Sequence, residues 1–259
     1  MNIRPLRQSV RPSPIFLLVI AVTAAGGALA WIAADTIRPL SYVGVFILVI
    51  AGWLMSLCLH EFGHAFTAWR FGDHGVETRG YLTLNPLKYT HPMLSLGLPV
   101  LIIALGGIGF PGGAVYLQTH WMTARQKSIV SLAGPAANLV LAVLLLGLTR
   151  AFWDPAHAVF WSGIAFLGFL QVTALVLNLL PIPGLDGYGA LEPHLNPETQ
   201  RALAPAKQWG FLIVVVLLIT PALNRWFFEL VYWFFDFSGV SSYLVSAGAQ
   251  LTRFWSAWF

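Results

Sequence analysis

Long apolar stretches divide the chain into predicted membrane-spanning segments. A helix needs about 20 predominantly apolar residues to cross the hydrocarbon core of a bilayer. The stretches that approach or exceed this length, the last of them short, are 15–34, 42–69, 128–148, 159–180 and 209–223. This pattern predicts an all-α polytopic membrane protein with about five to six transmembrane helices. The aromatic tail after residue 224 fits either amphipathic helices at the interface or a sixth span.

The region between the second and third apolar stretches has a different pattern. Residues 92–110 are apolar but rich in glycine and proline, which favours a re-entrant segment. Residues 73–88 carry β-forming side chains around Tyr81 and Thr83, bounded by Gly80 and by Asn85 before a proline. We therefore expect one or two short β-strands at the membrane surface here.

The composition agrees with a location in the membrane. Only 9% of the 259 residues are charged and 58% are hydrophobic, with a mean hydropathy of +0.74, whereas soluble domains carry about 25% charged residues. The net charge of +4 is expected to reflect topology and contact with anionic lipid, because no nucleic-acid-binding motif is present. The single cysteine, Cys58, excludes an internal disulfide.

We expect a single membrane-embedded domain, because no connection between the apolar stretches is long enough to form a soluble one. It would comprise residues 1–259, with a catalytic core at about 42–189 and accessory helices at 15–34 and 208–259. The first apolar stretch follows three arginines, and it is long for a cleaved signal peptide. It is therefore expected to remain as a helix.

The second apolar stretch contains the sequence HEFGH, which has the form H-E-x-x-H. His60 and His64 are four residues apart and so lie on one face of a helix, where both imidazoles reach one metal ion. Glu61 stands beside them and is placed to take a proton from water. The alternative is a hydrogen-bonded pair of structural histidines, but three ionisable groups within five residues of an apolar helix are rarely structural.

A catalytic zinc site needs a third protein ligand. Asp186 is the strongest candidate, because Pro181 and Pro183 end the preceding helix and let the chain turn back toward the membrane. An ordinary turn aspartate before glycine is the other reading of Asp186. His91 is a possible accessory ligand, although a loop histidine is the simpler interpretation.

Asn138 lies in the third apolar stretch, in the sequence AGPAAN. A buried amide in a membrane span needs hydrogen-bond partners. It either bonds a neighbouring helix or donates to a substrate carbonyl or oxyanion at the metal.

The sequences HEFGH, AGPAAN and NLLPIPGLDG together resemble the site-2 protease family of intramembrane zinc metalloproteases. The resemblance implies that His60, His64 and Asp186 bind one Zn²⁺ per chain and that Glu61 is the catalytic base. It also implies that Asn138 helps to hold the substrate peptide or its oxyanion. The implied reaction is cleavage of transmembrane or membrane-proximal proteins by a compact family form without PDZ or nucleotide-sensing domains.

The metal site constrains the topology. If residues 92–110 crossed the bilayer, the second and fourth apolar stretches would run in opposite directions, and Asp186 would emerge far from His60. A re-entrant segment instead brings the two residues to one depth. Because His60 comes late in its span and the N-terminus is expected inside, we expect the site near the cytoplasmic side of the membrane. The lack of a long targeting extension favours a prokaryotic inner membrane.

Two other functions remain open at this point. A metallopeptidase acting on small or surface peptides would use the same residues. An ion or metal transporter would place polar residues at mid-membrane on several helices, often in repeated segments, and the sequence shows neither.

Overall fold

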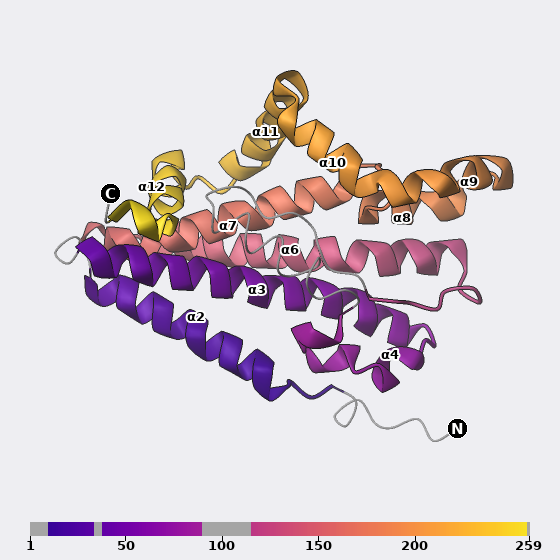
Figure 1. Ribbon diagram of the computed structural model, residues 1–259, viewed down its shortest axis with the longest axis horizontal. Helices are drawn as coiled ribbons and strands as arrows, with labels where there is room; N and C mark the ends of the chain where they lie inside the picture. Colours follow the sequence, from indigo (N-terminus) through magenta and orange to yellow (C-terminus); the bar gives the residue numbers. More distant parts are fainter. Residues whose placement is uncertain (1–9, 34–37, 90–114, 258–259) are drawn as a thin grey trace.

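The computed structural model describes residues 10–33, 38–89 and 115–257, and it is built from helices (Figure 1). Four of these helices are long: α2 (Pro14–Ala33), α3 (Arg38–Arg70), α6 (Ala124–Phe152) and α7 (Ala158–Leu179). Shorter helices follow: α8 (Asp186–Leu191), α9 (Pro197–Leu203), α10 (Gly210–Ile219), α11 (Pro221–Asp236) and α12 (Ser242–Thr252).

The predicted spans are confirmed as helices long and apolar enough to cross a membrane. Among the described residues there are five: 14–33, 39–70, 124–152, 155–179 and 197–219. The fifth begins earlier than expected, because α9 and a 3₁₀ turn at Ala204–Trp209 lead directly into α10. In the tail, α11 and α12 contain 16 and 11 residues, which is shorter than the roughly 20 that a crossing requires. The chain is therefore a polytopic membrane protein.

The direction of the helices meets the requirement set by the metal site. Figure 1 shows α3 and α7 running the same way along the bundle, with α6 running the opposite way. The end of α3 and the start of α6 lie at the same end of the bundle, where the Trp121 indole N–H donates to the carbonyl of Phe71 at 3.1 Å. The predicted re-entrant segment, 92–110, lies outside the described residues.

Helix α7 forms the centre of the bundle. Its apolar window is 89% buried, compared with 28% for α2 and 33% for α6. It packs against α3, α6, α11 and α12, which explains why its sequence is apolar on all sides. The end of this central helix therefore has a fixed position relative to α3 and α6.

Small residues allow α2 and α3 to approach closely. A Cβ atom added to Gly26 would lie 2.5 Å from the backbone nitrogen of Leu48, and one added to Gly44 would lie 2.6 Å from the backbone nitrogen of Ala30. Membrane helices commonly associate through such small residues, because lipid supplies no hydrophobic driving force between them. The first helix is thus packed on α3, most closely where α2 ends and α3 begins (Figure 1).

The predicted β-strands at residues 73–88 are wrong. The chain there forms a short helix, α4 (Gly75–Thr78), and two 3₁₀ turns, η1 (Tyr81–Thr83) and η2 (Pro86–Lys88). Leu84 adopts a left-handed conformation with a φ of 56°, which a strand does not accommodate. The Asn85 side chain accepts from the backbone N–H of Leu87 at 3.0 Å, so it starts a turn. Local side-chain capping outweighs the β propensity of this segment.

Candidate metal centre

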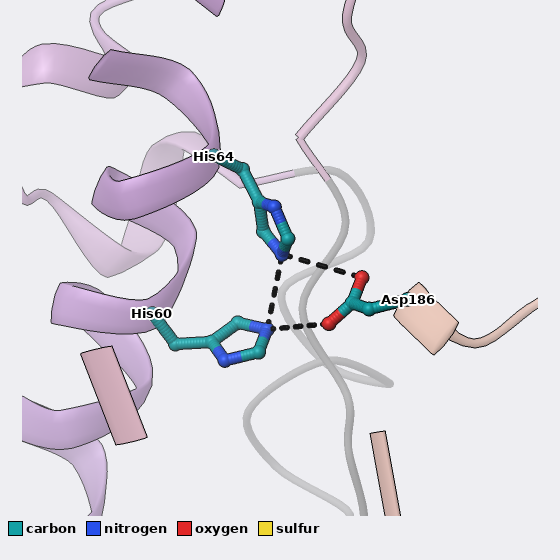
Figure 2. A group of neighbouring side chains, drawn as sticks. All are labelled: His60, His64 and Asp186. Atoms are coloured by element: carbon teal, nitrogen blue, oxygen red, sulfur yellow. Dashed lines mark hydrogen bonds and ion pairs between the residues drawn. The ribbon is translucent and has the colours of Figure 1, made fainter. Parts of the chain in front are cut away.

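His60 and His64 lie one turn apart on α3 and point to the same place (Figure 2). Both are buried, with 6% and 7% of their surface exposed. Their Nε2 atoms are 3.2 Å apart. The helical spacing of four residues thus produces the shared face that the sequence predicts.

Asp186 is brought to these histidines by the broken end of α7. The helix ends at Leu179, and the chain turns through Gly184, whose φ of 102° is unfavourable for other residues. Asp186 is the first residue of α8. Helix α8 is held on α6 because the Ser128 hydroxyl donates to the carbonyl of Ala190 at 2.6 Å.

The three side chains form a group with the dimensions of a metal site. One carboxylate oxygen of Asp186 lies 3.3 Å from His60 Nε2, and the other lies 3.3 Å from His64 Nε2. Zinc ligand distances of about 2.0–2.2 Å place neighbouring ligand atoms of a tetrahedral site roughly 3.3–3.5 Å apart. Two imidazoles and one carboxylate are also a known ligand set of catalytic zinc. The residues therefore fit the ion.

The positions of the protons on the two imidazoles favour a cation between them. His64 Nδ1 lies 2.8 Å from the carbonyl of Val130, and a carbonyl only accepts, so Nδ1 carries the proton. His60 Nδ1 lies 2.6 Å from Oδ1 of Asn138. If both protons sit on Nδ1, both Nε2 atoms turn bare lone pairs toward each other and toward a carboxylate. A metal ion between them resolves this repulsion.

The Asp186 carboxyl is held in the form that binds metals. Burial by itself raises the pKa of this group, but the nearby imidazoles of His64 and His60 outweigh burial and hold the pKa well below its usual range. A metal ligand must be deprotonated. Asp186 therefore meets this condition throughout the neutral range.

The crossing of α3 and α6 leaves no spare space at the centre. A Cβ atom added to Gly134 would meet His64 and would lie 2.6 Å from Nε2 of His60. On the other helix, a Cβ added to Gly63 would lie 2.7 Å from the carbonyl oxygen of Ala133. The imidazoles thus occupy the volume that any larger residue at position 134 would fill.

Glu61 lies beside the metal group and is 2% exposed. The backbone N–H of Val115 donates to its carboxylate. Glu61 borders a cavity of about 280 Å³ that is also lined by both histidines, Asn138 and Asp186. The cavity offers room for water and for part of a substrate next to the carboxylate.

Residues 115–118 border this cavity and are held by hydrogen bonds to side chains that follow α3. The Arg79 guanidinium donates to the carbonyl of Tyr116 at 2.9 Å, and the backbone N–H of Gln118 donates to Asp73 at 2.7 Å. Val115 and Leu117 line the cavity. The segment beside Glu61 is therefore anchored on the residues that follow α3.

Sequence reasoning identified Asn138 but missed two polar residues that it is linked to, Gln171 and Ser56. Asn138, which is 3% exposed, donates through Nδ2 to Oε1 of Gln171 at 2.8 Å, and Gln171 donates to the Ser56 hydroxyl at 2.9 Å. Gln171 is the first amide side chain in the predominantly apolar sequence of α7. An amide among apolar residues of a membrane span needs a buried partner, and this is the feature of the sequence that points to Gln171.

The other histidines do not join the centre in the part of the chain that the structure describes. His157 pairs with Asp154 at 2.7 Å, and His194 lies 2.9 Å from the Ser128 hydroxyl. The only metal-binding group found among the described residues is His60, His64 and Asp186. His91 lies outside the described residues.

Comparison with known proteins identifies several relatives. Over 253 residues, the chain is 69% identical to a protein of Mycobacterium tuberculosis (strain ATCC 25618 / H37Rv) named as zinc metalloprotease Rip2, and the match covers 98% of both chains. It is 31% identical to YwhC of Bacillus subtilis (strain 168), likewise named as a zinc metalloprotease, over 71% of this chain and 84% of the relative. No family model and no solved structure matches the chain.

Replacing Asp186 tests the third ligand. Asp186→Ala removes one of the three metal ligands, so we expect zinc affinity to fall by more than about a hundredfold, beyond the loss typical of outer-shell changes. Zinc per chain and chelator competition in detergent measure this. Asp154→Ala, an aspartate in the loop between α6 and α7, should leave zinc binding unchanged. Unaltered affinity in Asp186→Ala would remove this residue as a ligand.

Gly134→Ala tests the tight crossing of α3 and α6. The added methyl group overlaps both imidazoles, so we expect zinc affinity to fall at least about tenfold, because side-chain geometry at a metal site is sensitive to small displacements. Gly147→Ala, on the same helix, is the matched control, because a Cβ atom added there meets nothing within 4 Å. Equal zinc affinity in the two variants would contradict the packing argument.

Proposed function

Since the chain belongs to the site-2 protease family of zinc metalloproteases, we propose that it hydrolyses peptide bonds of transmembrane or membrane-proximal proteins inside the bilayer. The observation that carries this proposal is the position of the metal group. His60 and His64 are buried in a helix long enough to span a membrane, and Asp186 follows the central helix of the bundle. A protease for soluble peptides has no need of a centre at this depth.

The residues of the chain divide the chemistry between them. A zinc ion held by His60, His64 and Asp186 supplies a Lewis acid that polarises a peptide carbonyl and acidifies water. Glu61 takes the proton of the attacking water and delivers it to the leaving amine. Asn138 uses one of its two amide hydrogens on Gln171, which leaves the second for a substrate carbonyl or oxyanion.

A substrate helix must unwind before it is cut. Its carbonyls are engaged in internal hydrogen bonds, and none is free for attack inside a bilayer. We propose that the anchored segment at residues 115–118 pairs with the unwound substrate as an added strand. Val115 and Leu117 line the cavity beside Glu61, which supports this role.

We propose that the site lies toward the cytoplasmic side of a prokaryotic inner membrane. The bundle end that holds the site also carries most of the basic residues described near helix ends, as the positive-inside rule favours. These are Arg11, Arg70, Arg79, Lys88, Arg125, Lys127, Arg201 and Lys207. Within residues 1–259 we treat 42–189 as the catalytic core, because it holds every proposed site residue, and 15–34 and 208–259 as accessory helices.

Glu61→Gln separates metal binding from catalysis. The variant keeps all three metal ligands and the shape of the side chain but lacks the base, so we expect normal zinc content and a loss of cleavage of about 10²–10⁴-fold. Cleavage is followed by gel assay, and Glu198→Gln, an exposed residue of α9, serves as the control. Full activity in Glu61→Gln would exclude this mechanism.

The substrate class is tested in liposomes. Purified protein is mixed with labelled single-span proteins and with soluble peptides of the same cleavage-region sequences, with and without a zinc chelator. We expect chelator-sensitive cleavage of the single-span proteins. If only the soluble peptides are cut, the chain is a peptidase for surface peptides; if neither is cut, intramembrane proteolysis is not its function.

A further inference from the structure

A continuous chain of buried hydrogen bonds connects the metal centre to the backbone of α3. His60 Nδ1 lies 2.6 Å from Asn138 Oδ1, and Asn138 Nδ2 lies 2.8 Å from Gln171 Oε1. Gln171 Nε2 lies 2.9 Å from the Ser56 hydroxyl, which donates to the carbonyl of Trp53 at 2.7 Å. The three linking side chains, on α6, α7 and α3, are each no more than 3% exposed.

The backbone carbonyl at the far end sets the direction of every bond in this chain. A carbonyl accepts only, so the single hydroxyl hydrogen of Ser56 points at Trp53. The Ser56 oxygen then accepts from the amide nitrogen of Gln171, which leaves the oxygen of Gln171 to accept from the amide nitrogen of Asn138. The Asn138 oxygen therefore faces His60 and requires a proton on Nδ1.

We propose that Gln171 and Ser56 are positioning residues of the zinc site, which act through Asn138 to keep the bare Nε2 of His60 directed at the metal. With Nδ1 protonated, Nε2 carries the lone pair that a metal ligand needs. Neither residue touches the metal group. The inference rests on the zinc site and is independent of which substrate is cleaved.

Burial makes this hydrogen-bond chain effective. Asn138 and Gln171 are 3% and 0% exposed, so each amide keeps the orientation that its neighbours dictate. Without Gln171, Asn138 Nδ2 loses its acceptor, and the Asn138 amide is free to rotate its N–H toward His60. His60 would then carry its proton on Nε2, where it blocks metal binding.

The two histidines differ in how they are secured. His64 donates to the backbone carbonyl of Val130, which cannot reverse its role. His60 depends on side-chain amides, which can rotate by half a turn. Substitutions in the hydrogen-bond chain should therefore change the tautomer of His60 and leave the tautomer of His64 as it is.

Zinc affinity of the full-length protein in detergent, measured by chelator competition without substrate, tests the proposal. We expect Gln171→Leu to weaken zinc binding about 10–100-fold, the usual effect of losing an outer-shell partner. Ser56→Ala should weaken it by a smaller factor, because Gln171 loses only one of its two partners. Thr173→Val is the matched control, since the hydroxyl of this equally buried α7 residue bonds its own helix at Phe169.

A second measurement distinguishes positioning from general loss of stability. Nitrogen-15 NMR of the metal-free protein, with the His60 signal identified by its loss in His60→Gln, should show a proton on Nδ1 in the parent chain and in Thr173→Val, and a mixture of both forms in Gln171→Leu. If Gln171→Leu does not fold, Ser56→Ala decides by the same two measurements. The proposal is overturned if the folded variants match Thr173→Val in zinc affinity within twofold and keep the Nδ1 proton.

Discussion

The structure depends on one contact: two histidine nitrogens 3.2 Å apart, each facing the same carboxylate, inside a bundle of apolar helices. Ionisable groups are costly inside a membrane bundle and are found there where they serve a purpose, and Oδ2 of Asp186 has no hydrogen-bond partner among the described residues. The carboxylate comes from beyond α7 and the histidines from α3, which requires these helices to run in the same direction. The direction of the helices and the geometry of the metal centre therefore constrain each other.

Close backbone packing holds the helices in this arrangement. Gly134 leaves room for the imidazoles, and a Cβ at Gly187 would collide with the carbonyls at the end of α7. Without side chains at these points, α6 lies directly against the histidines, and α8 folds back on α7. Small residues let helices approach closely in lipid, and here the same glycines let the ligand atoms come within metal-binding distance. A loss of packing at the crossing is therefore also a loss of the site.

The sequence predicts the parts of this arrangement that follow from local rules. Histidines four residues apart share a helix face, and prolines after α7 end it before Asp186. The prediction of strands near Tyr81 is wrong because the turn chemistry of Asn85 and its neighbours outweighs the β propensity of this segment. Gln171 could not be paired with Asn138 from the sequence, since their contact depends on the rotation of α7 against α6, which apolar periodicity leaves undetermined in a helix buried on all sides.

The central position of α7 has a consequence for how the site responds to change. This helix supplies Gln171 to the hydrogen-bond chain that faces His60, and its broken end supplies Asp186. A shift of α7 against α3 therefore alters the orientation of one histidine and the position of the third ligand together. His64, secured on the backbone of α6, would stay in place.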